Sequence, residues 1–125
     1  MYLLIDMSQN NRISLALFQG KEQKSKSYEG RNRELLESIS HFLEEEKLSR
    51  KDIHGIAVVV GVGSFTSTRI ATVIANVFGF VGNIPIIRIS EEEKEDYSLL
   101  EKKLKKQKKG VYISAKYSGE PNIQK

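Results

Sequence analysis

The stretch from Gly55 to Ser90 constrains the fold more than any other part of the chain. It opens with a continuous apolar, largely β-branched run at residues 56–60, which is typical of a strand covered on both faces. A turn with two glycines at 61–64 leads into an apolar helical segment that should end near Gly82, and a second apolar run follows at 86–89. This order makes a βαβ unit, so we expect two parallel strands joined by a right-handed crossover.

The residues before this unit predict three antiparallel strands and a helix. Residues 2–6 form a short apolar run that ends in an acid, and residues 12–18 alternate apolar and polar side chains like a hairpin partner. Residues 22–28 are polar and charged, which suits an edge strand that must not pair with a second molecule. From about 31 to 47 the apolar residues recur at helical spacing, so an amphipathic helix is expected there.

The residues after the unit predict one further helix and an extended end. Ser90 and Glu93 have the spacing of a capping box, and acids then precede lysines along the segment, which complements a helix dipole at both ends. We therefore expect a single helix over 91–109, followed by an extended segment at 111–117.

Together these elements predict a single α/β domain of the ribonuclease-H-like type. Three antiparallel strands and two crossovers give a mixed five-stranded sheet of order 3-2-1-4-5, with the first two helices on one face and the third on the other. The absence of cysteine from the 125 residues excludes disulfides, thiol nucleophiles and thiolate metal sites. Polar residues and a turn interrupt the apolar stretch 70–87, so a soluble protein is expected rather than a membrane span.

Within the βαβ unit the string GVGSFTSTRI, followed later by NIP, resembles the signature of the TsaB family, also called YeaZ. The family pattern is approximately G-P-G-S-F-T-G-L-R-I-G and then N-I-P. Asp6 and Ser8 match the family's opening I-D-T-S. The departures from the pattern are Val62, Ser67, Thr68 and Ala71. The matching residues of the unit are Gly61, Gly63, Ser64, Phe65, Thr66, Arg69, Ile70, Asn83, Ile84 and Pro85.

The resemblance implies an actin-like (ASKHA) half with a non-catalytic role, and the absence of cysteine fits the reducing cytoplasm, where we expect the protein. TsaB proteins are similar to the larger TsaD subunit and pair with it. With the ATPase TsaE and a threonylcarbamoyl-AMP synthase, that pair makes threonylcarbamoyladenosine on tRNA. The chain is thus expected to bind a TsaD-like subunit, with a TsaE-like ATPase as a further candidate partner, to contact tRNA only indirectly and to use no cofactor. Residues 1–90 would form the ASKHA-like N-terminal domain, and 91–125 a helix and tail that complete the same domain, the family's second domain being absent.

Two alternatives from other functional classes stay open. One is a free-standing homodimer that uses the same helices on itself, and the other is a degenerate actin-like kinase half. For the kinase, Asp6 lies where such enzymes bring an acid toward magnesium, although a strand-end acid that bonds local backbone has the same position. The turn with Ser64 could cradle a phosphate or be structural, and it lacks the lysine of a P-loop. His41 and His54 are expected at the surface, so no metal ligand and no catalytic residue is predicted.

The lysines at 102–109 also have two interpretations. They could contact RNA phosphates, or they could form the solvent-exposed face of a helix whose terminal charges complement the helix dipole. Seven lysines at 94–109 stand against six acids at 91–101, a net charge of only +1, and this balance favours the solvated helix.

The helix expected before Gly82 is apolar nearly all round, so it has to be buried on more than one side. Ala71, Ala75 and Gly79 form a stripe of small residues that suits close packing either on the chain's own sheet or against a partner helix. Spacing leaves both open, and the resemblance favours the partner. The expected partner-binding residues are Leu36, Ile39, Leu43, Thr68, Ala71, Thr72, Ala75, Asn76 and Gly79.

Overall fold

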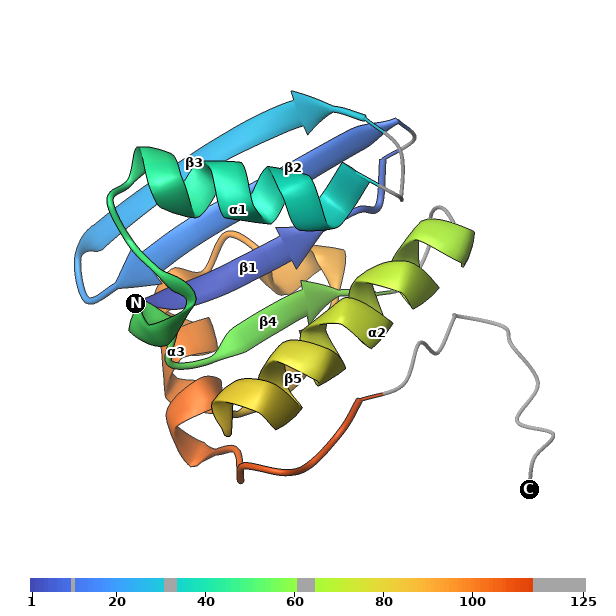
Figure 1. Ribbon diagram of the computed structural model, residues 1–125. Helices are drawn as coiled ribbons and strands as arrows, with labels where there is room; N and C mark the ends of the chain where they lie inside the picture. The colour runs from blue at the N-terminus through green and yellow to red at the C-terminus, as the bar shows by residue number, and fades with distance from the viewer. Residues whose placement is uncertain (10, 31–33, 61–64, 114–125) are drawn as a thin grey trace, which may run out of the picture.

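The computed structural model describes residues 1–9, 11–30, 34–60 and 65–113, with the backbone alone at 65–67 (Figure 1). Within these residues the strands are β1 (Tyr2–Asp6), β2 (Arg12–Gln19), β3 (Glu22–Glu29), β4 (Ile56–Val59) and β5 (Ile86–Ile89). They form one five-stranded sheet of order β3-β2-β1-β4-β5. The strands β3, β2 and β1 pair antiparallel, whereas β1, β4 and β5 run parallel. The predicted mixed sheet and its strand order are confirmed.

The helices lie on both faces of the sheet, as predicted. Figure 1 shows α1 (Leu35–Glu45) and α2 (Phe65–Gly82) on one face and α3 (Tyr97–Lys106) on the other. The helix predicted from about residue 31 is described from Leu35 onward, since 31–33 lie outside the described residues. None of the helices in the described part of the chain combines the length and apolar character that a bilayer crossing requires.

The sheet is apolar on both faces, and β1 shows why two layers of helix are needed. Leu3 and Ile5 belong to the core that packs under α1 and α2, whereas Leu4 between them belongs to the core under α3. Successive side chains of a strand point to opposite faces, so a central strand of this composition has to be covered twice. On the second face Leu100 and Leu104 of α3 close the core, and each is at most 1% exposed.

β3 is the polar edge strand that the sequence predicts. It pairs only with β2 among the described strands, and most of its side chains are exposed. Lys24 forms an ion pair with Glu46 (3.0 Å), and Lys26 forms one with Glu45 (2.8 Å), so the edge is tied by charge to the end of α1. Charged side chains of this kind discourage pairing with another chain.

The single helix predicted over 91–109 is wrong, because the chain breaks before Asp96. The capping box does form, with the Ser90 backbone N–H donating to Glu93 Oε1 at 3.0 Å, but it closes only a 3-10 turn, η3 (Glu91–Glu93). Asp96 then caps a second element, since its Oδ1 accepts from the backbone N–H of Leu99 at 3.1 Å. α3 is therefore shorter than predicted at both ends.

The extended segment predicted at 111–117 does not join the sheet in its described part, 111–113, and the rest lies outside the described residues. The side chain of Asn76 on α2 holds it instead. Asn76 Nδ2 donates to the carbonyl of Ile113 (2.9 Å), and the Ile113 N–H donates to Asn76 Oδ1 (3.0 Å). These bonds keep the segment beside α2 rather than on the edge of β5.

Candidate partner-binding surface

The outward side of α2 carries large apolar side chains that nothing in the described chain covers. Val73, Val77, Phe80 and Val81 are 60%, 51%, 72% and 52% exposed. Their spacing places them on one side of the helix, and we call these four residues the α2 strip. Leu36 of α1, on the same face of the sheet, is 50% exposed as well. Single exposed apolar residues are ordinary, but a row of four on one helix marks a surface suited to a partner.

The structure places most of the expected partner-binding residues elsewhere, inside the chain's own core. Leu36 lies at the surface. Asn76 is half-buried, and its side chain is hydrogen-bonded to Ile113. The buried ones, which cannot face a partner in this fold, are Ile39, Leu43, Thr68, Ala71, Thr72, Ala75 and Gly79.

The expectation that the small-residue stripe faces outward is therefore wrong. Ala71 and Ala75 are 0% exposed, and a Cβ built on Gly79 would lie 2.6 Å from Ile86 Cγ1 of β5. Small side chains let the backbone of α2 come close to the sheet. The polar members of this inner face are also satisfied, since Thr72 Oγ1 donates to the Thr68 carbonyl at 2.8 Å.

Sequence reasoning missed the α2 strip, although a signal for it was present. The strip lies on the side of the helix opposite the small stripe, so the large apolar residues point outward and the small ones inward. Such an arrangement is the reverse of what burial of apolar area alone would favour. The contrast in side-chain size between the two sides was readable in the sequence, but not which side meets the sheet.

The first half of the family motif cannot be described in full. Gly61, Gly63 and Ser64 are outside the described residues, and the same holds for the side chains of Phe65 and Thr66 at the start of α2. The phosphate-cradle hypothesis for this turn therefore stays a prediction. Arg69 is described and is exposed.

Asp6, the candidate magnesium acid, is engaged on all sides by the chain itself. It is 7% exposed, and its Oδ1 accepts from the backbone N–H (3.0 Å) and the hydroxyl (2.6 Å) of Ser8. Its Oδ2 accepts from Lys94 Nζ at 2.8 Å. Burial alone would raise the pKa of Asp6, but the hydrogen bonds from Lys94 and Ser8 outweigh it and lower the pKa; the same contact raises the pKa of Lys94. The local-backbone interpretation of Asp6 is the one that the geometry supports, with an added ion pair.

The two histidines lie at the surface, as predicted. His41 is 3.8 Å from Glu45 on the next turn of α1, and His54 Nδ1 is 3.1 Å from the amino group of Met1. Among the described residues no three or more His, Asp or Glu side chains gather as a metal site would require.

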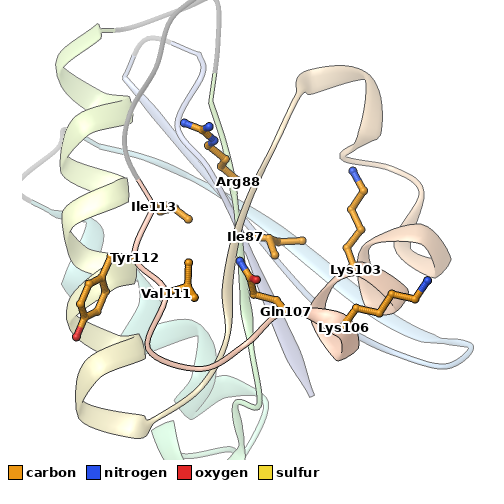
Figure 2. Close-up of a pocket in the computed structure, with 8 residues that line it drawn as sticks. All are labelled: Ile87, Arg88, Lys103, Lys106, Gln107, Val111, Tyr112 and Ile113. Carbon is orange, nitrogen blue, oxygen red and sulfur yellow. The ribbon is translucent and has the colours of Figure 1, made fainter. Parts of the chain in front are cut away.

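Two cavities open near α3. One, of about 490 Å³, lies between β5, α3 and the segment after it. Figure 2 shows that Arg88 extends along β5, whereas Lys103 and Lys106 extend from α3 in other directions, so the three cationic ends do not converge on one point. The other, of about 650 Å³, shares Gln107 with the first, lies where the parallel strands begin and is lined by several basic residues.

Comparisons with known proteins agree with this architecture. A family model described as TsaD, tRNA N6-adenosine threonylcarbamoyltransferase, matches residues 27–117. Two solved structures from Pseudomonas aeruginosa are similar, one described as an uncharacterized protein with similarity to peptidase YEAZ and the other as YeaZ. Each is 25% identical, has a TM-score of 0.64 and covers 71% of this chain. The chain spans only 42% and 43% of the length of those two chains. Among curated proteins no match was found.

Proposed function

The chain belongs to the TsaD family of tRNA N6-adenosine threonylcarbamoyltransferases, and from this premise we propose that it is a non-catalytic, TsaB-like subunit. In this role it binds a TsaD-like partner in the cytoplasm, and the pair serves threonylcarbamoyladenosine modification of tRNA. A TsaE-like ATPase is a further candidate partner. The likeness to YeaZ in fold and in motif supports the TsaB-like assignment.

The observation that carries the proposal is the α2 strip. The large apolar residues on the outer side of α2 are exposed to solvent in the free chain. A partner that covers them would remove apolar surface from water, which contributes favourable free energy of association. Aromatic residues such as Phe80, at 72% exposure, are typical anchors of protein interfaces. A partner helix laid along the strip would pack on α2 from the side opposite the sheet.

The environment of Asp6 supports the non-catalytic part of the proposal. A magnesium-binding acid needs an oxygen that is open to the ion and its waters. Both carboxylate oxygens of Asp6 already accept short hydrogen bonds, and Lys94 brings its own positive charge to the place where a cation would sit. Metal binding there would have to displace this lysine.

The proposal is tested by mixing the chain with the TsaD-like subunit of the same organism and measuring binding by calorimetry. In the variant Val77→Asp, a charge replaces a side chain at the middle of the α2 strip, and the affinity should fall at least about 30-fold, the size of a 2 kcal/mol hot-spot loss. Val111→Asp is the matched control, because Val111 is 44% exposed but lies off the strip. Equal affinity of both variants, or no complex with the wild-type chain at micromolar concentration, would contradict the proposal.

The two alternatives give different results in the same set of experiments. A homodimer that uses the strip on itself would elute as a dimer in the absence of the partner, and Val77→Asp would convert it to a monomer. A degenerate kinase half would bind magnesium-ATP at micromolar concentration in the isolated chain. The hydrogen bonds around Asp6 disfavour the kinase, whereas the exposed strip itself keeps the homodimer as the second candidate.

A further inference from the structure

The end of the molecule at which β1, β4 and β5 begin is strongly basic and hollowed. The cavity of about 650 Å³ lies there, between the end of α2, the 3-10 turn η2 (Arg50–Asp52) and the end of α3. Its apolar floor includes Phe78, Ile84 and Leu104. The charged residues that line it in the described part of the chain are all cationic: Arg50, Lys51, Lys105 and Lys109. We call these four residues the basic end.

The break before α3 is what separates these cations from the acids near them in sequence. Residues 91–96 hold five acids and one lysine, a net charge of −4, whereas residues 97–109 hold six lysines and one acid, a net charge of +5. The net charge of +1 over residues 91–109 is therefore the sum of a negative segment before α3 and a positive segment that contains α3. No acid lies in the first turn of α3, contrary to the continuous helix that the sequence predicts.

Two acids near α3, Glu93 and Glu101, are already paired. Glu93 forms an ion pair with Lys103, and Glu101 accepts from the Gly20 backbone N–H (2.8 Å) and pairs with Lys105 (3.1 Å). On η2, Asp52 accepts from the Ser49 N–H in a capping box. Within the described residues, no carboxylate lies within ion-pair distance of three side chains of the basic end, namely those of Arg50, Lys51 and Lys109.

The solvated-helix interpretation explains only part of this charge. Lysines in the last turn of a helix gain from its dipole, which accounts for Lys105 and Lys106. It does not account for Arg50 and Lys51, which belong to η2 and line the same cavity as Lys109. Cations from separate elements around one hollow have the arrangement that phosphate binding requires, and the apolar lining offers room for a sugar or base edge.

We propose that the basic end binds the phosphate backbone of RNA, so that this chain contacts tRNA directly rather than only through its partner. The proposal rests on the proposed function only for the choice of tRNA as the RNA. Its prediction is a salt-dependent affinity, because each lysine that neutralises a phosphate releases a counterion, and removing one such lysine lowers the salt slope by about 1.

The test measures fluorescence anisotropy of a labelled, unmodified tRNA transcript with the full chain between 50 and 200 mM KCl. The triple variant Arg50→Gln, Lys51→Gln, Lys109→Gln removes three cations that line the cavity. It should bind at least about tenfold more weakly at 100 mM KCl, with a slope of log Kd against log salt lower by about 3. The matched control is the triple variant Arg12→Gln, Lys21→Gln, Lys24→Gln, which removes the same charge from exposed positions on β2, on β3 and in the turn between them. Thermal melts of both variants should match the wild type, since all six side chains are exposed.

Three outcomes overturn the proposal: a wild-type chain that does not bind tRNA at 50 mM KCl, an equal loss in both triple variants, or a loss that follows a lowered melting temperature. The first triple variant should still bind the TsaD-like subunit like the wild type. Failure of RNA binding with an intact protein complex therefore removes this inference alone. Failure of the protein complex with intact RNA binding removes the proposed function alone.

Discussion

The placement of the small stripe can be tested with one pair of substitutions on the same helix. Ala75 is 0% exposed and lies on the side of α2 that faces the sheet. Val77, two residues further along the helix, lies on the outer side and is 51% exposed. Arginine is introduced at each position in turn, Ala75→Arg and Val77→Arg. Both changes add the same charge to α2, and arginine is a good helix former, so helix propensity does not separate the two variants.

The expected costs differ widely. At Ala75 the new side chain overfills a close-packed layer, which costs about 1–3 kcal/mol, and it leaves a buried charge unpaired, which adds about 3–5 kcal/mol. The sum, about 4–8 kcal/mol, is comparable to the whole free energy of unfolding of a small domain, about 5–15 kcal/mol. At about 4 °C for each kcal/mol, the melting temperature should fall by about 15 °C or more, or the variant should not fold. At Val77 the change should stay within about 0.5 kcal/mol.

The assay is thermal unfolding followed by circular dichroism on the isolated chain, with partner binding measured in parallel. Val77→Arg is expected to melt like the wild type and to lose the partner, and Ala75→Arg to lose its fold. If Ala75→Arg melts within a few degrees of the wild type, Ala75 does not lie in the core and the small stripe faces outward after all. If Val77→Arg unfolds instead, the two sides of α2 are reversed.

Three further substitutions probe single contacts. Gly79→Ala should destabilise the chain by about 1 kcal/mol in urea unfolding, because the new Cβ would lie 2.6 Å from Ile86 Cγ1 and this crowding exceeds the roughly 1 kcal/mol of helix propensity that alanine gains. Asp6→Asn should cost about 1–3 kcal/mol at pH 7 by weakening the bond to Lys94. Since the folded pKa of Asp6 is lowered, that difference should be full above the ordinary carboxyl pKa near 4 and disappear as pH falls through the folded value. Asn76→Ala should speed amide hydrogen exchange in residues 111–113 without lowering the melting temperature by more than a few degrees, because both lost bonds hold a peripheral segment.

Patterns that depend on neighbours in sequence were predictable. The apolar β-branched runs of β4 and β5 and the alternation along β2 are local patterns, so the strands and their order could be predicted from the sequence. The exposure of β3 and the capping box of Ser90 and Glu93 were also readable, because edge charges and caps are local signals. The break before Asp96 was not predictable from the sequence. The acids at 91–96 are compatible with the start of one continuous helix and equally with a turn followed by a second helix cap.

The sequence by itself determined the mixed sheet and the need to cover both of its faces. It also determined that α2 is too apolar to be exposed to solvent on all sides. Only the tertiary structure decided which side of α2 meets the sheet. The sequence of a helix that is apolar on all sides does not specify which side faces the sheet. The side with Ala75 and Gly79 faces it because small side chains let the backbone of α2 come close to β5. Phe80 therefore points outward. The pairing of Asp6 with Lys94, 88 residues away, was likewise decided in three dimensions, because a lone charge carries no record in the sequence of the partner that folding brings to it.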